Sequence, residues 1–181
     1  MHVPVLVMLA GLPGAGKSRL AAALAREAGF TVLDKDLVHT VVLEAGMARD
    51  QAAGLAYDII FRLTEDLLTR QRQSVIVDSA GRQPFILDRM QAMAQAGGVQ
   101  LRVTRCLASA PVREARMAGR SALPTQWTQN QATADDEQRW YAHLPAETLM
   151  LDMEQPFEQA VQIALRFIRS DHPPVTGTSS T

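Results

Sequence analysis

The chain is poor in cysteine, lysine and aromatic side chains. Among its 181 residues it has one cysteine, Cys106, and aromatic residues make up 5% of the total. A single cysteine excludes an internal disulfide, and no cysteine and histidine residues recur at the spacing of a metal site. Cys106 falls within an apolar stretch of strand length, so we expect a buried, reduced thiol there. Lysine occurs only at Lys17 and Lys35, whereas the remaining basic residues are arginines.

The chain also lacks a strong net charge and a long hydrophobic run. Its net charge is −1, so no overall basic field indicates binding to nucleic acid or to an anionic membrane. The apolar run at 3–10 is too short to span a bilayer and has no preceding basic region, so we expect a cytoplasmic location. A hydrophobic content of 47% supports one core. The sequence predicts one domain over 1–170 and a disordered tail at 171–181, which is rich in Pro, Ser and Thr.

The most informative stretch lies between that apolar run and an Ala- and Leu-rich segment with helical periodicity. It reads G-x-x-x-x-G-K-S over 11–18, the pattern of a phosphate-binding loop between a strand and a helix. Glycines let the backbone wrap closely around phosphates, and the following helix presents unpaired N–H groups to an anion. The predicted nucleotide-binding residues of this loop are Gly11, Pro13, Gly14, Ala15, Gly16, Lys17, Ser18 and Arg19.

Two side chains of the loop bear on catalysis. Lys17 offers a compact charge that reaches the β- and γ-phosphates, and Ser18 offers a hydroxyl ligand for Mg²⁺. Because the chain otherwise prefers arginine so strongly, a lysine at this position is consistent with a need for a point charge.

Apolar strand-length runs and helical patterns alternate along the rest of the chain. This alternation predicts an α/β fold with a parallel sheet covered by helices on both faces. The expected strands are 3–10, 31–33, 74–77, 99–107 and 148–152, and the expected later helices are 37–44, 48–71, 84–96, 111–120, 135–143 and 156–169.

Two carboxylates follow the second predicted strand, at the sheet edge that carries the phosphate loop. Phosphoryl transfer to a hydroxyl requires a carboxylate that accepts the proton of the attacking oxygen. Asp36 is the main candidate for this base; alternatively it caps the next helix, or Asp34 is the base. Lys35, between them, is expected to point the other way.

Asp78 ends the third strand, where a carboxylate can hold Mg²⁺ or the acceptor, although a turn-forming aspartate is also possible there. The stretch 78–81 matches the D-x-x-G of GTPases. However, Asn130 is the only asparagine, so the N-K-x-D signature of guanine recognition is absent. The glycines also do not follow the G-x-G-x-x-G of dinucleotide-binding proteins.

Arginines supply the remaining candidates. Spacings of three and four place Arg113, Arg116 and Arg120 on one helix face, where they repel one another unless an anion lies opposite. Nucleotide phosphates are one such anion, and a solvated basic face is the alternative. Arg82, just beyond Asp78, can bind a charged acceptor.

Together, the phosphate loop, Asp36, the "LLTRQRQSVIVDSA" strand and the "REARMAGR" helix resemble small P-loop kinases of the AAA_33 or predicted-kinase type. That group is similar to chloramphenicol phosphotransferase, zeta toxin, gluconate kinase and the kinase domain of polynucleotide kinase. The resemblance implies a three-layer fold, strand order 2-3-1-4-5 and a small helical lid at about 111–133. It also implies that Arg116 and Arg120 are lid arginines and that 152–156 passes near adenine. The stretch 124–131 departs from the family pattern.

These observations predict an ATP- and Mg²⁺-dependent kinase that transfers the γ-phosphate to a hydroxyl of a small molecule. The predicted catalytic residues are Lys17, Asp36, Arg116 and Arg120, with Arg116 also on the nucleotide. Asp36, Asp78 and Arg82 are expected to bind the acceptor, and Ser18 and Asp78 the metal. The alternatives are a polynucleotide 5′-hydroxyl kinase, with a basic groove beside the base, and an NTPase or switch without an acceptor.

Overall fold

A computed structural model describes residues 3–119, 121, 123–126 and 132–170. Arg120 and the tail 171–181, for which the sequence makes predictions, lie outside the described residues. The strands are β1 Val5–Ala10, β2 Thr31–Asp34, β3 Val75–Asp78, β4 Gln100–Leu107 and β5 Leu149–Asp152. The helices are α1 Lys17–Ala28, α2 Lys35–Glu44, α3 Arg49–Thr69, α4 Pro84–Gly97, α5 Ala110–Ala118, α6 Ala134–Tyr141 and α7 Phe157–Arg169.

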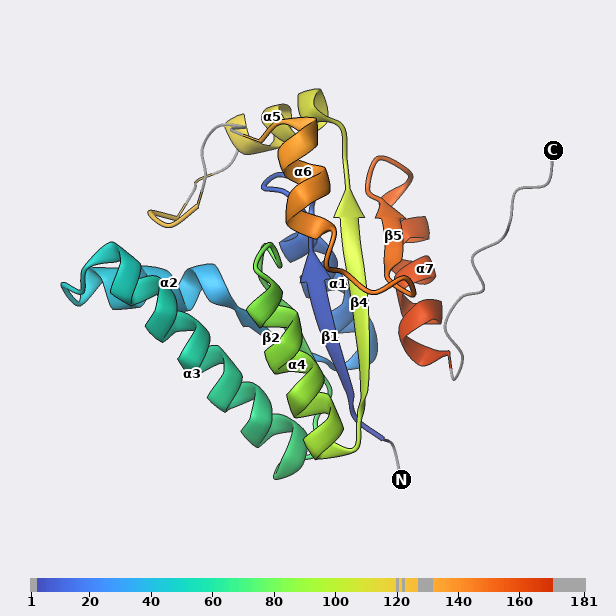
Figure 1. The fold of residues 1–181 in the computed structure, drawn as a ribbon. Helices are drawn as coiled ribbons and strands as arrows, with labels where there is room; N and C mark the ends of the chain where they lie inside the picture. Colours follow the sequence, from blue (N-terminus) through green and yellow to red (C-terminus); the bar gives the residue numbers. More distant parts are fainter. Residues whose placement is uncertain (1–2, 120, 122, 127–131, 171–181) are drawn as a thin grey trace.

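The five strands form one parallel sheet in the order β2-β3-β1-β4-β5 (Figure 1). The register pairs Met8 of the central strand with Val77 on one side and Val103 on the other. Both the alternating α/β class and the strand order implied by the resemblance are confirmed. Every expected strand and helix is present, and their ends agree with the prediction to within a few residues.

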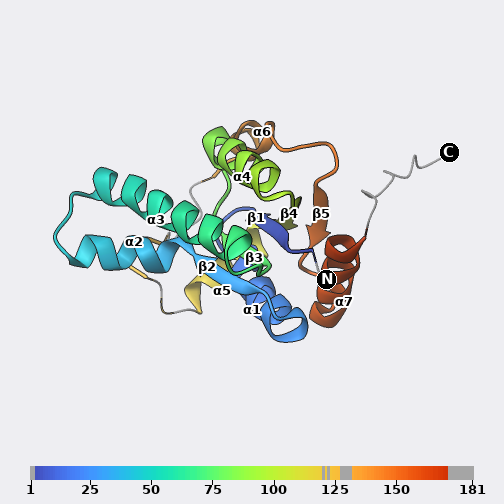
Figure 2. The ribbon, with the colours of Figure 1, turned by 90° about the horizontal axis from the view of Figure 1, so that it is seen from below.

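Helices cover both faces of the sheet, as the view along the strands shows (Figure 2). Helices α1 and α7 pack on one face, where Leu24 and Leu165 belong to a buried apolar cluster with Val7. Helices α3 and α4 pack on the other face, where Ile60 and Met90 join Leu6 and its neighbours. Since successive residues of β1 point to opposite faces, one apolar strand supplies both cores.

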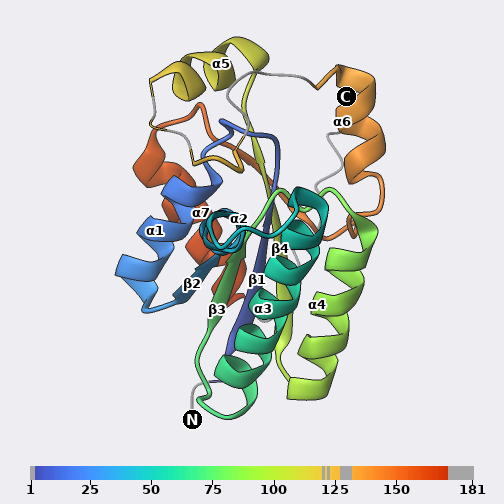
Figure 3. The same cartoon turned by 90° about the vertical axis from the view of Figure 1, so that its left-hand side faces the viewer.

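The remaining helices lie at the carboxyl ends of the strands. Figure 3 shows α5 and α6 above that edge of the sheet, on either side of the loop that follows β1. Tyr141 of α6 packs against Ala10 at the end of β1 and Leu12 of this loop, and its hydroxyl donates to the main-chain oxygen of Ala80 at 3.1 Å. This edge is therefore built from well-separated parts of the chain, and the predicted site residues gather there. Among the described residues, no helix combines the length and the apolar character that crossing a membrane requires.

Candidate active site

The loop after β1 has the backbone of a phosphate-binding loop. Gly11, Gly14 and Gly16 have φ angles of 136°, 79° and 99°, which residues with a side chain rarely adopt. A Cβ on Gly14 would lie 2.6 Å from the main-chain oxygen of Arg113, so α5 packs directly on the loop. Gly16 begins α1 without a side-chain cap, and no acidic residue lies in the first turn. The free N–H groups of this helix end are therefore available to an anion.

Lys17 and Ser18 point from the start of α1 into the same space. The Lys17 ammonium donates to the main-chain oxygens of Gly11 at 2.9 Å and Leu12 at 3.2 Å, so it lies within the loop. Ser18 is hydrogen-bonded to Asp78, which is 4% exposed at the end of β3. Burial raises the pKa of Asp78 to about 6, while the charge of Lys17 and the Ser18 hydroxyl oppose this shift.

Asp34 and Asp36 occupy different positions at the start of α2. Asp34 is the cap of this helix, and its carboxylate accepts from the N–H groups of Asp36 at 2.8 Å and Leu37 at 3.4 Å. Burial raises the pKa of Asp34. Asp36 therefore does not cap the helix, which corrects one alternative of the sequence analysis. Its side chain lines the cavity in front of the phosphate loop.

Lys35 does not point away from the two aspartates, contrary to expectation. Its ammonium lies 2.7 Å from Oδ1 of Asp36 and lines the same cavity. The expectation assumed the alternation of an extended chain, but α2 begins at Lys35, directly after β2. Consecutive residues of a helix are not on opposite sides, so a long side chain can fold back onto its neighbour.

Arg82 follows Gly81 in the loop after β3. Its guanidinium lies 4.8 Å from the ring centroid of Trp140 on α6, and its side chain lines the cavity. Its charge lowers the pKa of both Tyr57 and Tyr141, although burial dominates and raises the pKa of Tyr57 to about 12. The ring of Trp140 thus packs against the arginine in a cation–π contact that stabilises its position.

Of the predicted arginine set, Arg116 contacts the phosphate loop. Its Nη1 donates to the main-chain oxygens of Gly14 at 3.4 Å and Ala15 at 3.5 Å, and its Nη2 to that of Met153 at 2.7 Å. The residue therefore joins α5 to the loop and to the segment after β5. Arg19 lies nearby, with its guanidinium 3.8 Å from the ring centroid of Phe157, and both side chains line the cavity.

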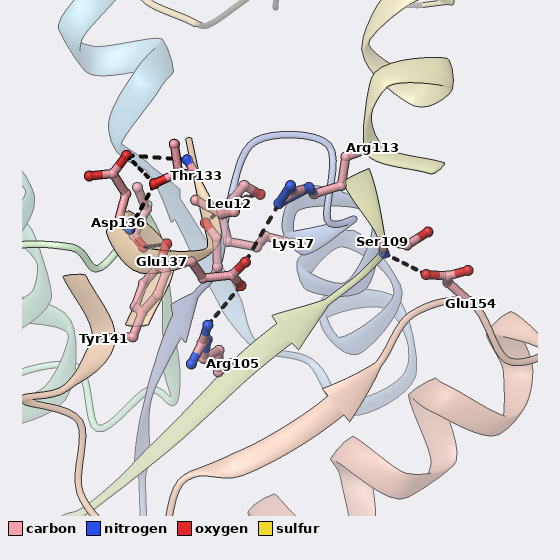
Figure 4. A network of polar contacts seen from close by, with 12 residues as sticks. Leu12, Lys17, Arg105, Ser109, Arg113, Thr133, Asp136, Glu137, Tyr141 and Glu154 are labelled. Carbon is pink, nitrogen blue, oxygen red and sulfur yellow. Dashed lines mark hydrogen bonds and ion pairs between the residues drawn. The ribbon is translucent and has the colours of Figure 1, made fainter. Parts of the chain in front are cut away.

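Arg113 has a different partner from the one expected. It is 4% exposed, and its Nη1 lies 4.0 Å from Oε2 of Glu137, whose Oε1 accepts from Arg105 at 2.7 Å (Figure 4). The anion opposite Arg113 is thus a side chain of α6, and Arg116, unlike Arg113, lines the cavity. Arg120 lies outside the described residues.

Several residues that shape the site could not be predicted from local sequence patterns. Glu137 lies 32 residues from Arg105 and 24 from Arg113, and no local pattern indicates such a pairing. Thr125 donates from Oγ1 to the main-chain oxygen of Asp36 at 3.2 Å and, with Gln126, lines the cavity. A signal for Lys35 was present in the rarity of lysine, because both lysines of the chain are in this site.

These groups surround one cavity of about 460 Å³. The phosphate loop, including Pro13, the start of α2 and the loop after β3 all line it. A cavity of this size suits a small molecule. Cys106 is not part of it; the thiol is buried as expected, and burial raises its pKa to about 12.

The residues present fit a nucleotide triphosphate and Mg²⁺. A Cβ at Gly11 or Gly14 would collide with neighbouring backbone, so this close path of the loop requires glycine, and the uncapped helix end faces the cavity. No group of three or more His, Cys, Asp or Glu side chains that could hold a metal occurs in the described part of the chain. Mg²⁺ commonly takes only one or two carboxylates and completes its shell with phosphate oxygens and water, which Ser18 and Asp78 suit.

Comparison with known proteins shows similarity to one protein family and to several solved kinase structures. The model of the AAA_33 family, an AAA domain, matches residues 6–145. A protein described as a kinase from Chloroflexus aurantiacus has a similar structure, with a TM-score of 0.70, 23% identity and coverage of 91% of this chain and 98% of that one. No curated protein matches the chain by sequence.

Two further structures share the fold. The gluconokinase of Sinorhizobium meliloti aligns with a TM-score of 0.61 and 20% identity, over 93% of each chain. The APS kinase CysC of Mycobacterium tuberculosis, solved with AMPPNP and APS, aligns with a TM-score of 0.63 and 16% identity, over 94% of this chain and all of that one. The sheet order and the flanking helices are therefore shared with solved P-loop kinases.

Proposed function

This chain belongs to the AAA_33 family of AAA domains, and we propose that it is a kinase that transfers the γ-phosphate of ATP to a hydroxyl of a small molecule. The observation that carries the proposal is that Asp36 and the phosphate loop line one and the same cavity of about 460 Å³. A donor site and a potential base thus face the same space, as phosphoryl transfer to a hydroxyl requires. The gluconokinase and APS kinase folds support this proposal by analogy.

The donor side holds the triphosphate. The N–H groups of the loop from Gly14 to Gly16 and the start of α1 bind phosphate oxygens, and Lys17 moves its ammonium from the loop carbonyls to them. The guanidinium of Arg116, which already contacts the loop, places a further positive charge beside the same oxygens. Ser18 and Asp78 would hold Mg²⁺, which would neutralise charge on the β- and γ-phosphates.

The acceptor side holds and activates the hydroxyl. Asp36 accepts its proton as the oxygen attacks the γ-phosphorus. Arg82 binds an anionic or strongly polar group of the same acceptor, stiffened by Trp140. Helix α5 and the described part of the segment that follows it act as the lid, because Thr125 contacts the backbone of Asp36 while Arg116 contacts the phosphate loop.

The character of the acceptor side favours a small polar molecule. Apart from Ala80, each cavity residue from the start of α2, the loop after β3 and 125–126 is polar or charged. Three carboxylates and two basic groups meet there, so the described residues form no basic groove beside Asp36. A polynucleotide acceptor would need such a groove and aromatic surfaces for stacking bases.

A transfer screen with labelled ATP tests the proposal. The panel contains gluconate, glucose, ribose, APS, chloramphenicol and a 5′-hydroxyl oligonucleotide, each with Mg²⁺. We expect the wild-type protein to transfer the label to one of the small polar hydroxyl compounds. Asp36→Asn should remove more than about 99% of transfer while ATP affinity stays within twofold, because a general base contributes roughly 100-fold or more.

Other outcomes separate the alternatives. Phosphorylation of the oligonucleotide, with binding that falls steeply with salt, would indicate a polynucleotide kinase. Slow ATP hydrolysis that no acceptor stimulates and that Asp36→Asn leaves unchanged would indicate an NTP-driven switch. Normal transfer by Asp36→Asn would show that the assigned base is wrong.

A further inference from the structure

Both lysines of the chain line the cavity. Lys17 belongs to the phosphate loop, whereas Lys35 is the first residue of α2, on the side of the proposed base. Every other basic residue is an arginine. The role of Lys17 follows from the phosphate loop, but nothing in that pattern accounts for Lys35.

Three groups hold the Lys35 ammonium in place. It lies 2.7 Å from Oδ1 of Asp36 and 3.4 Å from Nδ1 of His39, one turn further along α2. From α3, the ring of Tyr57 lies 5.7 Å from it, and the Lys35 side chain is only 15% exposed. A lysine enclosed in this way has lost most of its rotational freedom, so its contact with Asp36 is a defined geometry.

His39 is in the right state to accept from this ammonium. It is 6% exposed, and burial followed by the charge of Lys35 lowers its pKa, while a hydrogen bond with the Arg49 backbone and the charge of Asp36 oppose this shift. A lowered pKa leaves the imidazole neutral at pH 7, so Nδ1 can carry the lone pair that Lys35 requires. His39, Lys35 and Asp36 therefore form one chain of polar contacts along α2.

We propose that Lys35 is a positioning residue for the base: it holds Oδ1 of Asp36 and leaves Oδ2 to take the proton of the acceptor hydroxyl. The inference rests on the proposed kinase function. In the step, the hydroxyl oxygen bonds to the γ-phosphorus while the bond to the β–γ bridging oxygen breaks. ADP leaves with that electron pair, and the hydroxyl proton moves to Oδ2.

This role explains why the position is a lysine in a chain rich in arginine. An ammonium binds a carboxylate as a point charge through one oxygen, whereas a guanidinium forms two parallel hydrogen bonds and occupies both oxygens. Thr125 meanwhile holds the main chain of Asp36, so the carboxylate is fixed from two directions. Arginine at position 35 would keep the ion pair and remove the free oxygen.

The first arm of the test needs no substrate. Protein with ¹³C-labelled lysine gives only two Cε signals, and Lys35→Arg leaves the one from Lys17. We expect Asp36→Asn and His39→Ala each to shift the Lys35 signal, while Glu44→Gln, at the other end of α2, leaves it unchanged. A non-hydrolysable ATP analogue with Mg²⁺ should shift the Lys17 signal. A Lys35 signal that Asp36→Asn leaves unshifted would overturn the proposal.

The second arm measures transfer from labelled ATP to the compound in the panel that accepts phosphate. Lys35→Arg and Lys35→Met should each lower kcat by about 10- to 100-fold, since misplacing a catalytic group costs that much, while KM for ATP stays within twofold. A merely structural lysine would affect KM for ATP and the unfolding midpoint instead. Wild-type kcat in Lys35→Arg overturns the Lys35 proposal alone. If no compound accepts phosphate, the kinase proposal fails and the catalytic role of Lys35 with it, even where the first arm shows the contact.

Discussion

At the scale of single residues, the carboxyl edge of the sheet concentrates charge where the protein gives little access to water. Asp78 is 4% exposed and Arg113 is 4% exposed, whereas most charged residues of proteins remain in solvent. Each of the two has a partner of opposite charge or a hydrogen bond within the site. Charges held in this way are ready to bind a charged ligand without large rearrangement, at some expense in stability.

Asp78 shows that expense most clearly. Its pKa is about 6 in the fold against 3.8 ordinarily, so the folded state binds the proton more tightly, and stability falls as pH rises from about 4 to about 6. Asp78→Asn should therefore raise the free energy of unfolding of the nucleotide-free protein at pH 7.5, by up to about 3 kcal/mol. Denaturant unfolding measures this, and the gain should shrink toward pH 4. The exposed Asp88→Asn is the control, and a less stable Asp78→Asn protein at pH 7.5 would contradict the argument.

Gly14 and Gly29 separate two effects of a left-handed backbone. Their φ angles are similar, at 79° and 72°. A Cβ on Gly14 would collide with the Arg113 backbone, whereas a Cβ on Gly29 would have no neighbouring atom within 4 Å. Gly29→Ala should cost about 1–2 kcal/mol of stability and leave ATP affinity unchanged. Gly14→Ala should also weaken ATP binding by about tenfold, or 1.4 kcal/mol, by separating α5 from the loop. Titration calorimetry measures the affinities, and equal affinities in the two variants would refute the packing argument.

At the scale of elements, α6 joins parts of the site that are far apart in the sequence. Glu137 binds Arg105 at the end of β4 and Arg113 in α5, and Tyr141 packs on the phosphate loop. A capping box formed by Thr133 and Asp136 fixes the start of the helix (Figure 4). Helix α6 thus determines how α5, with Arg116, sits on the nucleotide side.

Glu137→Ala should therefore be strongly destabilising. It leaves Arg105 and Arg113, with side chains 14% and 5% exposed, without their carboxylate, and breaking such a buried pair typically costs about 3–5 kcal/mol. We also expect a higher KM for ATP, because α5 loses an anchor. The control is Asp66→Ala, which removes the exposed pair with Arg70 on α3 and should leave the denaturant midpoint close to that of the wild type. Similar midpoints for the two variants would refute the anchoring role.

At the scale of the whole molecule, the cavity lies where segments that follow all five strands meet. A ligand there can contact the segments after β1, β2, β3, β4 and β5, so binding should stabilise the entire domain. The sheet packs against two apolar cores, whereas the segments around the cavity carry the polar groups.

Mg²⁺ and ATP should accordingly raise the thermal midpoint. At a concentration 100 times Kd, binding adds about 2.7 kcal/mol, which corresponds to roughly 5–10 °C for a domain of this size. Lys17→Ala should lose most of this shift, because its ammonium is the full charge inside the loop. Differential scanning calorimetry with and without nucleotide gives both values. An undiminished shift in Lys17→Ala would contradict the role of the phosphate loop.

The fold and the donor side could be read from the sequence because both depend on local patterns. Alternating apolar runs and helical periodicity predicted the strands and helices, and the spacing of Gly11, Gly16 and Lys17 specified the loop. The side of the proposed acceptor could be read only in part. The position of Asp36 after β2 predicted its place at the cavity, but the contacts of Lys35 depend on the turn at which α2 begins.

The sequence by itself therefore determined which elements form, where the phosphate loop lies and which carboxylates stand at its edge of the sheet. Only the tertiary structure decided the partners of those groups. It paired Arg113 with Glu137 rather than with a nucleotide, made Asp34 the cap and placed Lys35 on Asp36. The physical reason is range: backbone conformation follows from neighbours within a few residues, whereas a buried charge takes whichever opposite charge the packing brings within about 4 Å.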